Sequence, residues 1–289
     1  MKTLFINGDG AVRAGWKIAG CFVLTVLLAV ALIAVRRVLP AGVQHVILEP
    51  LLMAAAALVA AWICLRLERT PLAALGLRLD ARFLRDSSLG TLLGIGLLCL
   101  AALLVWLGDG FHLEGTIAPE SSAATAWKIV RTLLPLAVFE ELTFRGYPFQ
   151  RALASLGARP AVLLFALLFA LVHLPNPGLN GGTFALALTN LFLASVMLSL
   201  CYLRTRSLAL PIGVHLGWNW TQTCLGFPSS GNPSHGMWMP ILHGKAAWLT
   251  GGEFGLEASI AGVVVLALAI VVLARWRPAG TASLRPVAA

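Results

Sequence analysis

The sequence predicts an all-α membrane protein, a polytopic bundle of about eight transmembrane helices with both termini in the cytoplasm. Of its 289 residues, 59% are hydrophobic and only 11% are charged, and the mean hydropathy is +0.87. Soluble domains carry about 25% charged residues, so a water-facing surface of this size would lack polar groups. The composition therefore excludes a soluble globular protein, a disordered chain and a coiled coil.

Apolar runs that can cross a bilayer recur along the chain. A helix needs about 20 apolar residues to cross a hydrocarbon core about 30 Å thick. The candidate spans are 18–35, 51–65, 89–107, two segments that begin near Trp127 and Pro160, 183–203, 208–225 and 258–274. The sequence contains no repeat of fixed period, so we expect one membrane domain.

The basic residues indicate how these spans are oriented. A net charge of +9 would suggest nucleic-acid binding in a soluble protein, but here it serves as an orientation signal. Basic residues gather at both ends of the chain and in alternate connections, namely Lys2, Arg13, Lys17, Arg66, Arg69, Arg78, Arg82, Arg85, Arg151, Arg159, Arg204, Arg206, Arg275, Arg277 and Arg285. The positive-inside rule places these segments in the cytoplasm, and only Arg36 and Arg37 break the pattern. We expect a lipid bilayer, and no nucleic acid, as the partner.

Three parts of the chain are distinguished by their content. Residues 1–126 hold the first three helices with their cytoplasmic and external loops. Residues 127–226 hold helices four to seven, which carry the unusual polar motifs. Residues 227–289 hold an external loop, the final membrane helix and a cytoplasmic tail.

The fourth span carries two adjacent glutamates, and ionisable side chains inside a membrane mark function by default. Glu140 lies about 20 Å along this span, at about 1.5 Å per residue. Glu141 and Arg145 are four residues apart with the acid first, which favours an ion pair. We predict Glu140 as a general base and the Glu141–Arg145 pair as its support. The alternative is a helix-stabilising ion cluster at the cytoplasmic interface.

Two further polar clusters fall at a similar depth. His173 closes the fifth span before a break rich in proline and glycine, and His215 and Asn219 share one face of the seventh span. An isolated histidine in an apolar helix is commonly structural. The convergence of all three clusters at one depth instead predicts a shared polar site.

These side chains can activate water in two ways. With a metal, Glu140, His173 and His215 would hold a zinc ion with an open position. Without one, Glu140 and His173 polarise the water, while His215 and Asn219 stabilise the oxyanion of a tetrahedral intermediate. Both versions predict hydrolysis, with an amide bond as the favoured substrate, and the residues leave the choice between them open.

The motifs resemble those of a known family of intramembrane proteases. The pattern consists of Glu140-Glu141-x-x-x-Arg145, Phe169-x-x-x-His173 and His215-x-x-x-Asn219, in this order on separate helices. It is similar to that of the CAAX prenyl protease and bacteriocin-processing (CPBP) family, also described as type II CAAX endopeptidase-like. The resemblance covers Trp127 to Leu225, and the stretch from Thr70 to Arg78 resembles a short cytoplasmic segment that often precedes the family core.

This resemblance implies an endopeptidase that cuts near the end of a membrane-attached protein or peptide. The substrate would be prenylated or bacteriocin-like, and the location would be a bacterial inner membrane. The implied catalytic residues are Glu140, Glu141, Arg145, His173, His215 and Asn219. The resemblance leaves open whether zinc is required.

Two hypotheses from other functional classes remain. Buried Glu and His residues also build proton relays, and the break at 175–182 resembles a discontinuous transporter helix. A proton-coupled transporter is therefore one alternative, although the chain lacks the internal repeat that many transporters have. The other is a non-catalytic membrane protein with an immunity or scaffold role.

Overall fold

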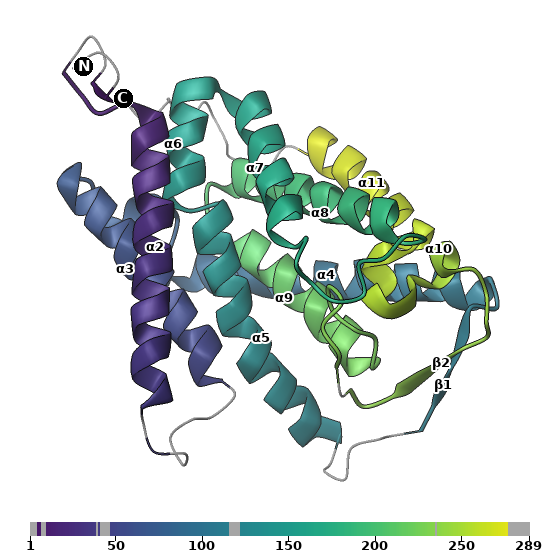
Figure 1. Cartoon of the computed structure of the whole chain (residues 1–289). Helices are drawn as coiled ribbons and strands as arrows, with labels where there is room; N and C mark the ends of the chain where they lie inside the picture. The colour runs from purple at the N-terminus through teal and green to yellow at the C-terminus, as the bar shows by residue number, and fades with distance from the viewer. Residues whose placement is uncertain are drawn as a thin grey trace.

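The computed structural model describes residues 5–6, 10–38, 40, 47–115, 122–234 and 236–276. Lys2, Arg277 and Arg285, which the orientation argument used, lie outside these residues. The fold is mostly helical (Figure 1). Its longer helices are α2 (Ala14–Arg37), α3 (Leu48–Leu67), α4 (Ala81–Leu107), α5 (Ser122–Phe144), α6 (Tyr147–Leu156), α7 (Ala158–Val172), α8 (Phe184–Thr205), α9 (Ala209–Cys224) and α11 (Ile260–Arg275). Short elements are η2 (Leu72–Leu75), α10 (Ala247–Thr250), η3 (Gly252–Phe254), η4 (Leu256–Ala258) and the strands β1 (Phe111–Glu114) and β2 (Met239–Leu242).

The all-α class is confirmed, and each predicted span coincides with one of the helices. Four helices, α2, α3, α4 and α8, are long and apolar enough to cross a membrane. Helices α7 and α11 are apolar but shorter. At about 1.5 Å per residue α7 measures about 23 Å, less than a typical hydrocarbon core. The protein is thus an integral membrane protein, while the count of eight crossings stays a prediction.

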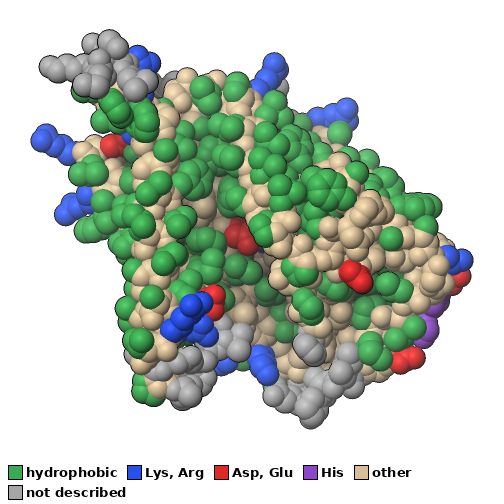
Figure 2. All heavy atoms as spheres, in the orientation of Figure 1, with side chains coloured by type: hydrophobic (Ala, Val, Ile, Leu, Met, Phe, Trp, Pro, Cys, Tyr) green, Lys and Arg blue, Asp and Glu red, His purple; other side chains and the backbone are tan. Residues whose placement is uncertain are grey.

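The outer surface is suited to lipid. Along α2, only Cys21 and Thr25 are buried, and large apolar side chains such as Val23, Val26 and Val30 are exposed. Figure 2 shows apolar side chains over most of one face, with Lys and Arg side chains mainly near its margins. Because lipid tails do not penalise exposed apolar side chains, α2 needs little cover from protein.

Helix α9 lies in the middle of the molecule, against α4 (Figure 1), and glycines let the two backbones meet. Gly90 and Gly94 of α4 face Gly213 and Gly217 of α9. A Cβ atom at any of the four would lie 2.1–2.5 Å from a backbone carbonyl oxygen of the other helix. Such glycine pairs four residues apart are a known means of close helix packing in membranes. They hold α9, and with it His215, close against α4.

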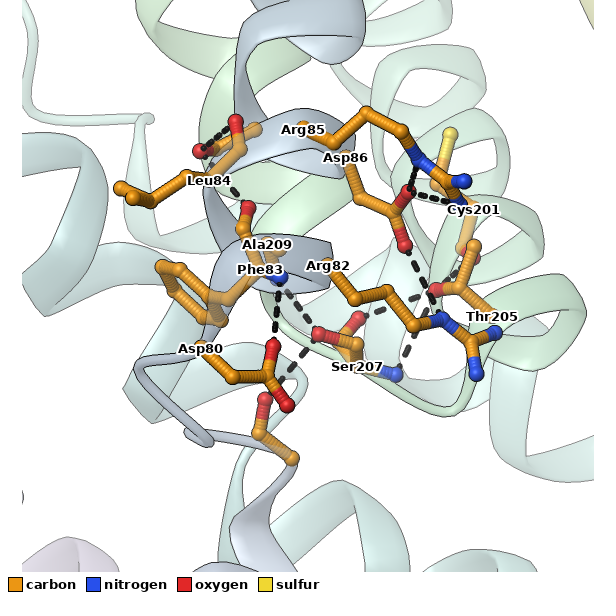
Figure 3. A network of polar contacts seen from close by, with 12 residues as sticks. Asp80, Arg82, Phe83, Leu84, Arg85, Asp86, Cys201, Thr205, Ser207 and Ala209 are labelled. Carbon is orange, nitrogen blue, oxygen red and sulfur yellow. Dashed lines mark hydrogen bonds and ion pairs between the residues drawn. The ribbon is translucent and has the colours of Figure 1, made fainter.

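The N-terminus of α4 extends beyond its apolar run into a polar network (Figure 3). Asp80 caps the helix by accepting a hydrogen bond from the Phe83 backbone N–H at 2.8 Å. The buried Asp86 pairs with Arg85 at 2.9 Å and with Arg82 at 3.5 Å. One acid therefore balances part of the charge of this basic segment, which the positive-inside rule places in the cytoplasm.

Two features differ from the sequence-based expectation. Helix α5 ends at Phe144, and the amphipathic helix α6 occupies what we expected to be a loop. At Gly146 a Cβ atom would lie 2.1 Å from the Leu142 carbonyl oxygen, so this turn requires glycine. The second feature is the antiparallel pair of β1 and β2, which joins the segment after α4 to the segment after α9.

Candidate active site

A buried ion pair forms the base of the site. Glu141 and Arg145 have no exposed surface, and Arg145 Nη1 donates to Glu141 Oε1 at 3.1 Å. Arg145 Nη2 donates to Ser195 Oγ at 2.7 Å and to the Ser195 carbonyl oxygen at 3.0 Å. The guanidinium also lies over the Phe169 ring, 5.2 Å from its centroid. Arg145 thus joins the end of α5 to α7 and α8, and it holds Glu141 in place.

His215, on α9, binds the same carboxylate. Its Nδ1 lies 2.8 Å from Glu141 Oε1, the oxygen that also binds Arg145. Because an ionised carboxylate only accepts hydrogen bonds, Nδ1 carries the proton. Nε2 lies 3.7 Å from Glu140 Oε2, which is beyond hydrogen-bond distance but close enough for an electrostatic interaction. Glu141 therefore orients the imidazole so that Nε2 is on the side of Glu140.

Glu140 and His173 reach the site from two other helices. The Glu140 side chain keeps 15% of its surface exposed, whereas that of Glu141 keeps none. His173 follows the last residue of α7, just before Pro175. Its Nδ1 lies 2.7 Å from the Phe169 carbonyl oxygen, so Nδ1 donates. The Nε2 atom of a neutral His173 then keeps its lone pair as an acceptor.

Four of the predicted site residues meet at one cavity. It contains about 460 Å³ of space, including its open mouth, and Glu140, His173, His215 and Asn219 line it. Apolar side chains of α8, α9 and α11 complete the wall, among them Leu191, Met197, Leu198, Val214 and Leu266. The cavity thus combines an acid, two imidazoles and an amide within a mainly apolar enclosure.

Sequence reasoning missed three polar residues at or beside the site. Ser195 binds Arg145 from α8, and Ser230 and Glu257 line the cavity. Ser195 gave no signal, because a hydroxyl is common in apolar helices, and Ser230 lies in a loop without a motif. Glu257 was detectable in principle, since it is an acid directly before the apolar run 258–274.

The predicted zinc ligands do not form a compact cluster among the described residues. Within the described residues, no three His, Cys, Asp or Glu side chains form a group that could hold a metal ion. Among the predicted ligands Glu140, His173 and His215, the last donates Nδ1 to Glu141, so only its Nε2 could bind a metal ion. Whether zinc is required stays a prediction, and the chemistry below uses only the chain's own groups.

Comparison with known proteins supports the resemblance seen in the motifs. Residues 122–221 match the family model described as Type II CAAX prenyl endopeptidase Rce1-like, and this segment contains every predicted site residue from Glu140 to Asn219. No curated protein matches the chain significantly. At the family level, the match supports an intramembrane endopeptidase that acts on a protein substrate in a lipid bilayer. The family resemblance is therefore confirmed: over residues 122–221 the chain is similar to the Rce1-like type II CAAX prenyl endopeptidases.

Proposed function

We propose that the protein hydrolyses a peptide bond near the end of a membrane-attached protein or peptide, with Glu140 as the general base. One observation carries this proposal: α5, α7 and α9 bring Glu140, His173, His215 and Asn219 to a single cavity. A structural ion cluster would have no need of a cavity beside it. The location we propose is a bacterial inner membrane.

The first step is the activation of water. Glu140 takes a proton from a water molecule, while the lone pair of His173 Nε2 accepts the second hydrogen bond of that water. The oxygen of the water attacks the carbonyl carbon and forms a tetrahedral intermediate. Glu140 then gives the proton to the leaving nitrogen as the C–N bond breaks, which returns it to the carboxylate form.

The negative charge of the intermediate needs donors. His215 carries one proton on Nδ1, bound to Glu141, and when Nε2 is also protonated it donates into the cavity. Asn219 lies one turn further along α9 and can donate through its side-chain amide. These two donors form the oxyanion site in this proposal. Glu141 and Arg145 act as positioning residues, because Glu141 binds His215, Arg145 binds Glu141, and neither lines the cavity.

Apolar walls favour a substrate with apolar residues around the cleaved bond. A prenylated or bacteriocin-like peptide attached to the membrane meets this requirement, because the bilayer delivers it at the depth of the cavity. Polar recognition would then fall to the few polar side chains of the wall, which are Glu140, His173, His215, Asn219, Ser230 and Glu257.

Cleavage of defined peptides tests the proposal. The purified protein in lipid vesicles should cut C-terminal peptides, prenylated or unprenylated, and Glu140→Gln and His173→Ala should each slow cleavage by about 10²–10⁴-fold. Glu253→Gln is the matched control, since Glu253 is exposed and lies outside the cavity. Full activity of Glu140→Gln would rule out the assigned base.

Two further measurements address the remaining alternatives. Absence of cleavage together with pH-driven uptake into vesicles would favour the proton-coupled transporter. Metal analysis, with cleavage assayed before and after chelation, tests the zinc prediction. Activity that is lost on chelation and restored by zinc would support a metal that recruits Glu140, His173 and His215.

A further inference from the structure

The cavity contains a second carboxylate that the hydrolytic mechanism does not use. Glu257 lies in η4, directly before α11, and only 6% of its surface is exposed. Its Oε2 accepts hydrogen bonds from Gln222 Nε2 at 3.1 Å, from Ser230 Oγ at 3.1 Å and from the Ser230 backbone N–H. All three reach the same oxygen. Among the residues that the structure describes, Oε1 therefore has no hydrogen-bond partner and retains its acceptor sites.

The three donors also hold Glu257 rigidly against the neighbouring segments. Gln222 donates to the Pro228 carbonyl oxygen at 2.7 Å, and Asn176 Nδ2 donates to the Ser230 carbonyl oxygen at 2.8 Å. These contacts tie together the end of α9, the segment after α7 and the loop after α9. A carboxylate fixed in this way is preorganised for a ligand.

The charge balance of the cavity is incomplete at this position. Glu141 is compensated by Arg145 and His215, and Glu140 lies beside His215. Glu257 forms no ion pair within the described residues, and no Lys or Arg among them lines the cavity. A buried carboxylate without a positive partner is unfavourable, so a cationic ligand would be stabilised here.

The distance between the two centres follows from α9. Gln222, which binds Glu257, comes seven residues after His215. At about 1.5 Å per residue, the two positions are separated by about 10 Å along the helix. An extended peptide covers this distance in about three residues. A side chain that reaches Glu257 therefore belongs to a residue within about three positions of the cleaved bond.

We propose that Glu257 forms an anionic subsite that binds a lysine or arginine side chain of the peptide substrate close to the cleaved bond. This inference rests on the proposed endopeptidase function and specifies its substrate class. The same carboxylate disfavours a glutamate, an aspartate or a free C-terminal carboxylate at that position. A substrate with a cationic residue at that position is thus favoured over one with an acidic residue there.

A peptide series tests the subsite in the wild-type protein. One membrane-anchored peptide is made with lysine, norleucine or glutamate at each of the three positions on either side of the cleaved bond, with a C-terminal amide or a free acid. At one position the kcat/KM for lysine should exceed that for norleucine by about tenfold or more, with glutamate below both. Equal rates for lysine and norleucine, or a preference for glutamate or the free acid, would overturn the subsite.

Glu257→Gln then tests the residue itself. The carbonyl oxygen of the introduced amide can still accept from Gln222 and Ser230, while an uncharged NH₂ group replaces Oε1. The lysine-to-norleucine ratio should fall to about one while norleucine peptides are still cleaved. Glu253→Gln removes the same charge four residues earlier on an exposed side chain and should retain the wild-type ratio.

The outcomes separate the subsite from the proposed function. A uniform loss of activity on all peptides in Glu257→Gln, with an unchanged ratio, would overturn the subsite and make Glu257 a scaffold residue. If Glu257→Gln does not fold, the wild-type series alone still decides. No cleavage of any peptide by the wild type, with Glu140→Gln indistinguishable from it, would instead contradict the endopeptidase function.

Discussion

Two carboxylate–imidazole pairs of equal length occupy opposite environments in this protein. Glu141 Oε1 and His215 Nδ1 lie 2.8 Å apart in the helical core, and Asp109 Oδ1 and His243 Nδ1 lie 2.8 Å apart beside the β1–β2 pair. The side chains of Glu141 and His215 keep 0% and 8% of their surface, whereas Asp109 keeps 69%. Distance alone thus does not determine what a pair contributes.

Breaking the two pairs has different consequences, because one pair is buried and the other is exposed. Glu141 has no exposed surface, so the loss of a partner leaves its charge buried and uncompensated. Beside the β1–β2 pair, water solvates both groups, and salt screens their attraction. Breaking the buried pair should therefore cost much more stability than breaking the exposed pair.

The largest effect is expected from removing the arginine beside the buried pair. Arg145→Ala leaves Glu141 with the hydrogen bond from His215 but without a permanently charged partner, and should destabilise the protein by about 3–5 kcal/mol. Thermal unfolding in detergent measures this change. Arg37→Ala, at the exposed end of α2, is the control and should stay within about 0.5 kcal/mol. Equal melting temperatures for the two variants would show that the ion pair between Arg145 and Glu141 does not stabilise the fold.

The second-largest effect is expected from a substitution that displaces α9. Gly217→Ala places a Cβ atom 2.2 Å from the Thr91 carbonyl oxygen, so α4 and α9 must separate, at a cost of about 1–3 kcal/mol. Gly20→Ala on α2 meets nothing within 4 Å and should be neutral or stabilising by up to about 1 kcal/mol, because alanine favours helix. Unfolding and cleavage are both measured, since movement of His215 should also slow cleavage. Identical behaviour of the two variants would contradict the close packing.

A smaller effect is expected on α8. Ser195→Ala removes the hydroxyl that accepts from Arg145 but keeps the carbonyl oxygen, and should cost about 1–2 kcal/mol. Ser199 lies one turn further along the same helix, and its buried Oγ has no hydrogen-bond partner among the described residues. Ser199→Ala should therefore be neutral or slightly stabilising. The melting temperatures of this matched pair test whether the hydrogen bond to Arg145 matters; a larger loss in Ser199→Ala would contradict it.

The smallest effect belongs to the exposed pair, and it depends on pH. The hydrogen bond from His243, followed by Lys245, lowers the pKa of Asp109 below its usual 3.8. A lowered pKa in the folded state contributes stability above pH about 4, and that contribution disappears as the pH falls through the folded value. Asp109→Asn should therefore lower the melting temperature slightly at pH 7 and not at pH about 2. A large drop at pH 7, similar to that of Arg145→Ala, would remove the contrast between the two pairs.

Much of the fold was predictable because its causes are local. Runs of apolar residues predict membrane helices from composition alone, and each of the eight predicted runs coincides with a helix. The i, i+4 spacing also anticipated the contact between Glu141 and Arg145, because residues four apart on a helix share a face. Whether Glu140, His173, His215 and Asn219 act in catalysis stays a prediction that the cleavage assay decides.

The remaining features depend on contacts between distant segments. Helix α6 was not predicted, because its amphipathic pattern falls within a basic segment that we expected to be a loop. Ser195 binds Arg145 across 50 residues, and Glu257 binds Gln222 across 35. The spacing of residues along the sequence does not indicate such pairs, because the packing of the helices determines which of their faces meet.

The sequence by itself thus determined the membrane location, the helical class, the family resemblance and the residue types available for hydrolysis. These follow from hydropathy and from periodicity along single helices. Only the tertiary structure decided that Glu141 is the buried partner of His215, that Glu140 remains open to the cavity, and that Glu257 joins the same wall. The physical reason is that the burial of a carboxylate is set by the side chains and backbones packed around it, and four glycines determine how closely α9 approaches α4.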